Sequence, residues 1–137
     1  MRSKHFTLEE LVSPDILAVV SPWAAWRLVS PFVMSLDILR DMVDCPIEIN
    51  RKGVAANRGV RPIGCKVGAK NSSHKGWEDR QGFDLVCNER ELLIEKVKKH
   101  SKALGILRME NPSKTIGWVH IEIGTKPTDK ELVVFDP

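Results

Sequence analysis

The chain has 137 residues, enough for one domain with a modest hydrophobic core. Its 42% hydrophobic and 28% charged residues exclude a disordered chain, and no apolar run approaches the ~20 residues of a membrane-spanning helix. The net charge is only +3, with lysines and arginines spread among acidic residues, which argues against a nucleic-acid partner. We therefore expect a monomer with a single domain over residues 1–137 that binds neither nucleic acid nor membrane.

The N-terminus is charged and is followed by no apolar segment of the kind that signal peptides contain. We therefore expect a cytoplasmic protein as synthesised, which leaves the cell, if at all, by a route such as lysis. Three cysteines without a Cys-x-x-Cys spacing indicate reduced thiols and no disulfide framework. A zinc site that uses Cys65 or Cys87 beside a histidine is an open alternative.

The first third of the chain is predicted to be helical. Thr7 and Glu10 form a capping box, so a short helix is expected to begin at residue 7 or 8. Serine at the N-cap with proline at the first helical position favours a helix start. The pair Ser30-Pro31 is expected to open a longer helix over 31–44. The three pairs with this pattern are Ser13-Pro14, Ser21-Pro22 and Ser30-Pro31.

The rest of the chain is predicted to be mostly strands. One further helix is expected from an N-cap at Asn88 to about His100, and residues 51–73 form a long basic loop of a kind that is often functional. Strands are predicted at residues 46–50, 82–87, 105–109, 118–123 and 132–135. Helices followed by strands indicate an α+β fold in which N-terminal helices pack on an antiparallel sheet.

Two histidines and one aspartate stand out as candidate metal ligands. His74 and Asp84 flank a glycine-containing turn, and His120 lies in an apolar, strand-like run. Such a set leaves one position of a tetrahedral zinc ion open for water. The alternative is a metal-free α+β protein whose histidines bind nothing.

Four short segments follow one another in the order Gly59-Val60-Arg61, Ser72-Ser73-His74, Gly82-Phe83-Asp84 and Trp118-Val119-His120. This order resembles the zinc D-Ala-D-Ala carboxypeptidase family, whose pattern is Gly-Tyr-Arg, then Ser-x-His-x-x-Gly-x-Ala-x-Asp, then Trp-x-His. The family includes phage peptidoglycan endopeptidases and vancomycin-resistance dipeptidases, and it shares its fold with the hedgehog signalling domain. Residues 5–11 and 46–50 also look like the small phage-type members.

The resemblance implies a Zn²⁺-dependent peptidase that cleaves peptidoglycan stem peptides, as a D,D-carboxypeptidase or an endolysin-type endopeptidase. A phage origin would fit release to the cell wall by lysis. Arg61 would pair with a carboxylate or carbonyl of the substrate during catalysis. Ser72 and Trp118 would contact the substrate. The implied zinc ligands are His74, Asp84 and His120.

Two departures from the family pattern matter. Asp84 lies ten residues after His74, further than in the family, so Asp79 becomes a competing ligand. Many members carry an acid three residues before the last histidine, where this chain has Gly117. Glu122, on the strand face of His120, is the first candidate for that catalytic role, and the weaker candidates are Glu110 and Glu78. The alternative function is a catalytically impaired relative that acts as a zinc-containing peptidoglycan-binding or structural module.

Overall fold

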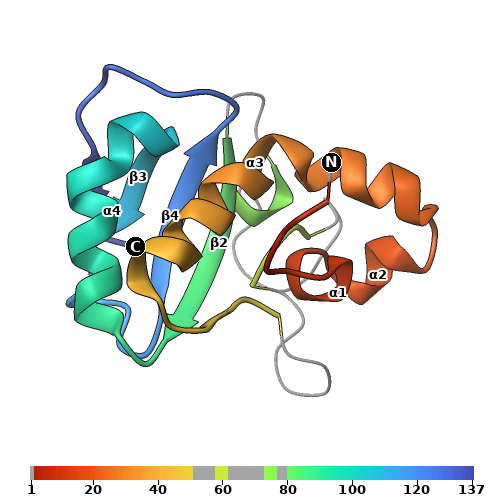
Figure 1. Ribbon diagram of the computed structural model, residues 1–137, viewed down its shortest axis with the longest axis horizontal. Coiled ribbons are helices and arrows are strands. Elements are labelled where there is room, and N and C mark those ends of the chain that lie inside the picture. The colour runs from red at the N-terminus through yellow and green to blue at the C-terminus, as the bar shows by residue number, and fades with distance from the viewer. Residues whose placement is uncertain (1, 51–57, 62–72, 77–79) are drawn as a thin grey trace.

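The structure is a computed structural model that describes residues 2–50, 58–61, 73–76 and 80–137 (Figure 1). It has the predicted α+β architecture, with helices at the N-terminus and a five-stranded sheet. Among the described residues, no helix is both long and apolar enough to cross a membrane. The helices are α1 (Leu8–Leu11), α2 (Pro14–Leu17), α3 (Pro22–Val43), the 3-10 helix η1 (Ser73–Lys75) and α4 (Arg90–Leu104).

The sheet is mixed: the predicted antiparallel pairing holds for its neighbouring strands except at the edge formed by β5. Its order is β1-β2-β4-β3-β5, and every neighbouring pair is antiparallel except β3 and β5. The segment between β4 and β5 carries the chain past β3 to its far side, where β5 runs parallel to β3. A short apolar run predicts a strand but not its direction, because side chains alternate in the same way in parallel and antiparallel strands. The strands are β1 (Ile47–Glu48), β2 (Arg80–Cys87), β3 (Ile106–Glu110), β4 (Val119–Gly124) and β5 (Val133–Phe135).

One of the predicted helix starts does not exist. Ser21 caps α3, since its side-chain oxygen accepts a hydrogen bond of 3.2 Å from the amide of Ala24. Pro31 instead lies inside this helix, which continues to Val43. Buried apolar side chains on both sides of Pro31 hold the helix against the sheet, and their burial outweighs the hydrogen bond that proline removes.

The other helix ends agree with the predictions in part. The capping box of α1 is confirmed, because the Thr7 amide donates to Glu10 Oε2 at 2.7 Å. The N-cap of α4 is Glu89 and not Asn88. This helix also extends beyond His100, and it ends at Gly105, whose φ of 67° suits a glycine.

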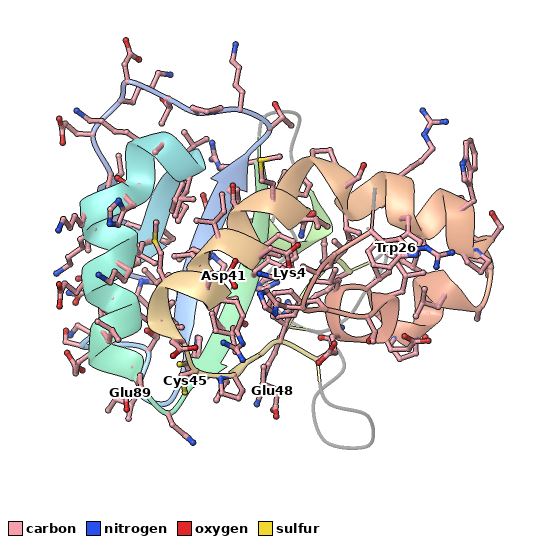
Figure 2. All side chains as sticks on the ribbon, viewed as in Figure 1. Lys4, Trp26, Asp41, Cys45, Glu48 and Glu89 are labelled. Carbon is pink, nitrogen blue, oxygen red and sulfur yellow. The ribbon has the colours of Figure 1, made fainter. Side chains whose placement is uncertain are left out.

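The N-terminal arm is tied to α3 by charged side chains (Figure 2). Asp41 lies between Lys4, whose Nζ is 3.2 Å from its Oδ1, and His5, whose Nε2 is 2.7 Å away. His5 is therefore a structural residue. Cys45, which follows α3, and Cys87, at the end of β2, are free thiols as expected.

Helices α3 and α4 cover one face of the sheet (Figure 1). The ring of Phe32 on α3 packs edge-on against Phe83 on β2, with 6.0 Å between their centroids. Buried apolar side chains from both helices and the sheet form one cluster. Because side chains alternate along a strand, Phe83 and Leu85 face the helices while Asp84 faces the opposite side. The polar residues of interest therefore lie on the sheet face away from α3 and α4.

Candidate metal centre

Three elements bring the candidate ligands together. Asp84 on β2 and His120 on β4 are directly opposite each other in the antiparallel ladder. His74 comes from η1, which the structure joins to the same sheet: the Gln81 side chain donates to the His74 carbonyl at 2.9 Å. The amide of Arg61 donates to that carbonyl as well, at 2.8 Å. The ladder and these bonds fix where each ligand lies.

The donor atoms have a separation that suits a metal ion. Asp84 Oδ1 is 2.7 Å from His120 Nδ1 and 3.2 Å from His74 Nε2, and all three ligand atoms lie within 4.8 Å of one another. Ligands at about 2.0–2.1 Å from a tetrahedral zinc ion would be about 3.3 Å apart. His74 and His120 are 4% and 5% exposed. These residues could therefore hold a metal ion at a largely buried position.

The backbone sets the orientation of His74. Its Nδ1 lies 3.0 Å from the carbonyl oxygen of Gly59, which can only accept a hydrogen bond. Nδ1 therefore donates to this carbonyl, and Nε2 is the ring nitrogen that faces Asp84. A backbone partner of this kind is the usual way in which a metal-binding histidine is held.

The second imidazole is held from its other side by polar side chains. His120 Nε2 lies 3.1 Å from Ser73 Oγ and 3.7 Å from Glu122 Oε1. Glu122 is only 2% exposed, and its Oε2 is 2.8 Å from Arg80 Nε and 3.5 Å from an amino nitrogen of Arg108. A proton on Nε2, facing this carboxylate, leaves Nδ1 available to a metal.

At Asp84 and at His120, burial and the pairing of the two side chains have opposite effects on the pKa. Burial opposes ionisation of Asp84, but the hydrogen bonds from His120 and His74 and the charges of these imidazoles together outweigh it and hold its pKa well below the usual range. Burial likewise disfavours the charged form of His120, yet the hydrogen bond to Asp84 and the nearby carboxylate of Glu122 raise its pKa to about 9. Without a metal, His120 is therefore an imidazolium at neutral pH, and a metal ion would take the place of its proton.

A glycine allows η1 to approach the sheet. A Cβ atom at Gly82 would lie 2.2 Å from Ser73 Oγ and 3.1 Å from His120 Cε1. Any larger residue would therefore displace Ser73, and with it the neighbouring His74. Gly82 thus allows η1 to pack beside the candidate metal ligands.

The structure accounts for the sequence-based candidates unequally. His74, Asp84 and His120 come together as expected. Arg61 lies beside this group, with an amino nitrogen 4.0 Å from Asp84 Oδ2, and Trp118, just before β4, is 39% exposed. Their roles toward a substrate stay predictions. The candidates that lie outside the described residues are Cys65, Ser72, Glu78 and Asp79.

Glu122 has surroundings that the sequence did not reveal. Its ion pair with Arg80 and its position behind His120 favour the orientation of the imidazole over proton transfer. The position of Arg80 near this centre could have been predicted from the sequence, because Arg80 and Asp84 lie on the same face of one strand. The contribution of Arg108 depends on the pairing of β3 with β4, which only the fold shows.

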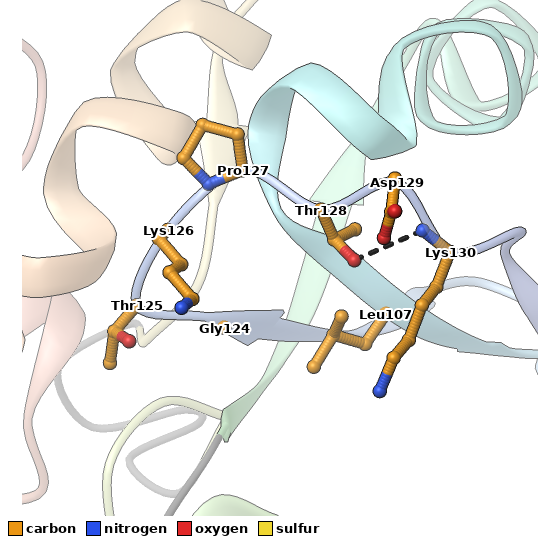
Figure 3. Close-up of a pocket in the computed structure, with 8 residues that line it drawn as sticks. All are labelled: Leu107, Gly124, Thr125, Lys126, Pro127, Thr128, Asp129 and Lys130. Atoms are coloured by element: carbon orange, nitrogen blue, oxygen red, sulfur yellow. Dashed lines mark hydrogen bonds between the residues drawn. The ribbon is translucent and has the colours of Figure 1, made fainter.

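A separate pocket of about 540 Å³ lies where β4 ends, at Gly124, and the following loop begins (Figure 3). Its lining includes Lys126 and Lys130 but none of the three candidate ligands. The pocket and the candidate metal centre are therefore different sites.

Comparisons with known proteins add no family assignment. The chain matches no protein-family model, and the comparisons with curated proteins and with solved structures found no match either. The resemblance to the zinc D-Ala-D-Ala carboxypeptidases thus rests on the motifs and stays a prediction.

Proposed function

We propose that this protein is a zinc-dependent peptidase that cleaves peptidoglycan stem peptides, as a D,D-carboxypeptidase or an endopeptidase. The observation that supports this most directly is the convergence of His74, Asp84 and His120, which are far apart in the sequence. Two imidazoles and one carboxylate are a common ligand set of catalytic zinc, and they leave a position for substrate. The motif order of the family supplies the substrate class.

A zinc ion bound here would polarise the peptide carbonyl and lower the pKa of water. The chain's own residues would hold the site in its working geometry. Gly59 and Glu122 orient the two imidazoles, and Asp84 contributes the negative charge. Arg61 stands next to Asp84 and could contact a substrate oxygen.

The proton acceptor is better placed at Glu110 than at Glu122. Met109 pairs with Ile121 across β3 and β4, so Glu110 is the next residue along the ladder and lies opposite His120. Its side chain is half-buried and no hydrogen bond to it is present among the described residues. Burial raises the pKa of Glu110, which is typical of a carboxyl group that exchanges protons during catalysis. We propose that Glu110 replaces the acid that the family carries where this chain has Gly117.

The second candidate function is a zinc-containing module that binds peptidoglycan without cleaving it. Gly117 supports this alternative, because it has a φ of 95° and no side chain to transfer a proton. The two functions predict the same metal content and differ only in turnover.

The test combines metal analysis with digestion of purified muropeptides. We expect one zinc ion per chain, release of D-alanine or shorter stem peptides, and loss of this release on chelation and in His120→Ala. His100→Ala is a matched control, since His100 lies on α4, away from the three ligands. Full activity in zinc-free protein would refute the proposal, and bound zinc without cleavage of D,D-, L,D- or L-Ala-D-Glu bonds would favour the binding module.

A further inference from the structure

We infer that Arg108 and Phe135 form an anion anchor beside the metal centre, which binds a carboxylate of the peptide substrate. The inference rests on the proposed function and specifies its substrate: a peptide with a free carboxylate close to the bond that is cut. Neither residue belongs to the motifs that carry the family resemblance.

The anchor lies next to the candidate ligands. The guanidinium carbon of Arg108 is 4.0 Å from the centroid of the Phe135 ring, and this ring is 6.3 Å from the imidazole of His120. The strand register explains the arrangement. Arg108 is opposite Glu122 on β4, and Phe135 on β5 is opposite Glu110. The Phe135 ring therefore contacts the guanidinium and also lies beside a candidate metal ligand.

The guanidinium keeps donors for a ligand. Among the described residues, its one ion pair is the 3.5 Å contact from an amino nitrogen to Glu122, and the Arg108 side chain makes no other hydrogen bond there. The closer partner of Glu122 is Arg80, at 2.8 Å. An arginine has five N–H donors in a planar fork that matches a carboxylate. The Arg108 side chain is 28% exposed, so these donors can be reached from solvent.

The charge of the site also favours an anion. The described carboxylates around the two imidazoles are matched in number by guanidinium groups, so a bound divalent ion would leave an excess of positive charge. Such an excess in a partly buried site attracts an anionic ligand. The carboxylates are Asp84, Glu110 and Glu122, and the guanidinium groups are those of Arg61, Arg80 and Arg108.

Arg108 is better suited than Arg61 to bind the substrate carboxylate. The Arg61 side chain is only 9% exposed, against 28% for Arg108, and it lies beside Asp84, a candidate metal ligand. The Phe135 ring, 4.0 Å from the guanidinium carbon, restricts the Arg108 side chain, which reduces the entropy lost when a carboxylate binds. The two arginines would thus have different roles, one in the centre and one at its edge.

The test measures binding as well as hydrolysis. Zinc-loaded protein is titrated by calorimetry with three probes: N-acetyl-D-Ala-D-Ala, its C-terminal amide, and an amidated peptide whose only carboxylate is a glutamate side chain. We expect one of the two acids to bind about 10- to 100-fold more tightly than the amide, as a charge-assisted hydrogen bond allows. The acid that is preferred identifies the source of the carboxylate.

In Arg108→Gln this preference should fall to nearly one, and in Phe135→Leu it should decrease several-fold. Arg27→Gln is the matched control, because Arg27 also lies over an aromatic ring, that of Trp23, 4.9 Å away on α3. Circular dichroism and zinc content verify that each variant is folded and loaded. An unchanged preference in Arg108→Gln, or no preference in the wild type, would overturn the anchor.

The two proposals can fail separately. Zinc-dependent hydrolysis that does not depend on Arg108 would remove the anchor and leave the peptidase. An acid preference that depends on Arg108 without any hydrolysis would support the anchor and favour the binding module over the peptidase.

Discussion

Raising the pH from 6.5 to 9 should destabilise the metal-free protein, because His120 then loses its proton. The pKa of His120 is raised from 6.5 to about 9 in the folded state, where the hydrogen bond to Asp84 and the nearby carboxylate of Glu122 outweigh the effect of burial. A raised pKa contributes stability that is fully present below the unfolded value of 6.5 and is lost as the pH rises through 9. The shift of 2.5 pH units (9 minus 6.5) corresponds to roughly 3 kcal/mol as an upper estimate.

The assay is urea unfolding of protein treated with a chelator, at intervals between pH 6 and 9. The free energy of unfolding should decrease with pH, with a slope that approaches about 1.4 kcal/mol per pH unit in the middle of this window. Asp84 does not contribute to the slope, since its lowered pKa places its titration far below the window. Zinc should show the opposite trend, binding more tightly as the pH rises toward 9, because it competes with the proton of His120.

Two variants locate the effect. His120→Gln should abolish the slope, and Asp84→Asn should shift it to lower pH, because the neutral amide no longer stabilises the imidazolium. A free energy of unfolding that stays constant from pH 6.5 to 9 in the wild type, or a slope that persists in His120→Gln, would refute the assigned ion pair.

Three further predictions concern packing. Gly82→Ala should destabilise the fold by about 1–3 kcal/mol and weaken zinc binding at least tenfold, because its Cβ would lie 2.2 Å from Ser73 Oγ. Unfolding and zinc titration measure the two effects. The double variant with Ser73→Ala should recover part of both losses, and additive effects would contradict the clash. Pro31→Ala should raise the free energy of unfolding by about 1–3 kcal/mol, since proline in a helix interior removes a hydrogen bond; a loss of stability would show that the proline is needed. Phe83→Ala should cost about 3–5 kcal/mol, because the fully buried ring packs between β2 and α3, and a cost below 1 kcal/mol would exclude Phe83 from the core.

Local patterns were enough to predict several features of this protein. The alternation of Phe83, Asp84 and Leu85 predicted a strand with one polar side, which β2 confirms. The capping box at Thr7 was also read correctly. In each case the interacting groups are close in the sequence, so local chemistry decides the outcome. The pairing of His74 with Asp84 and His120 was predicted only with the help of motif order.

Non-local contacts decided the remainder. Pro31 had the sequence of a helix start, but packing of both flanks against the sheet kept α3 continuous. The parallel pairing of β5 depends on the path of a loop, which no local pattern encodes. Glu122 shares a strand face with His120 in the sequence, yet its ion pair with Arg80 on β2 gives it an orienting role. The amino-acid sequence by itself determined which groups are available for chemistry at this site. Their roles were decided by the tertiary structure, because the charge and exposure of each group depend on neighbours that only the folded sheet brings together.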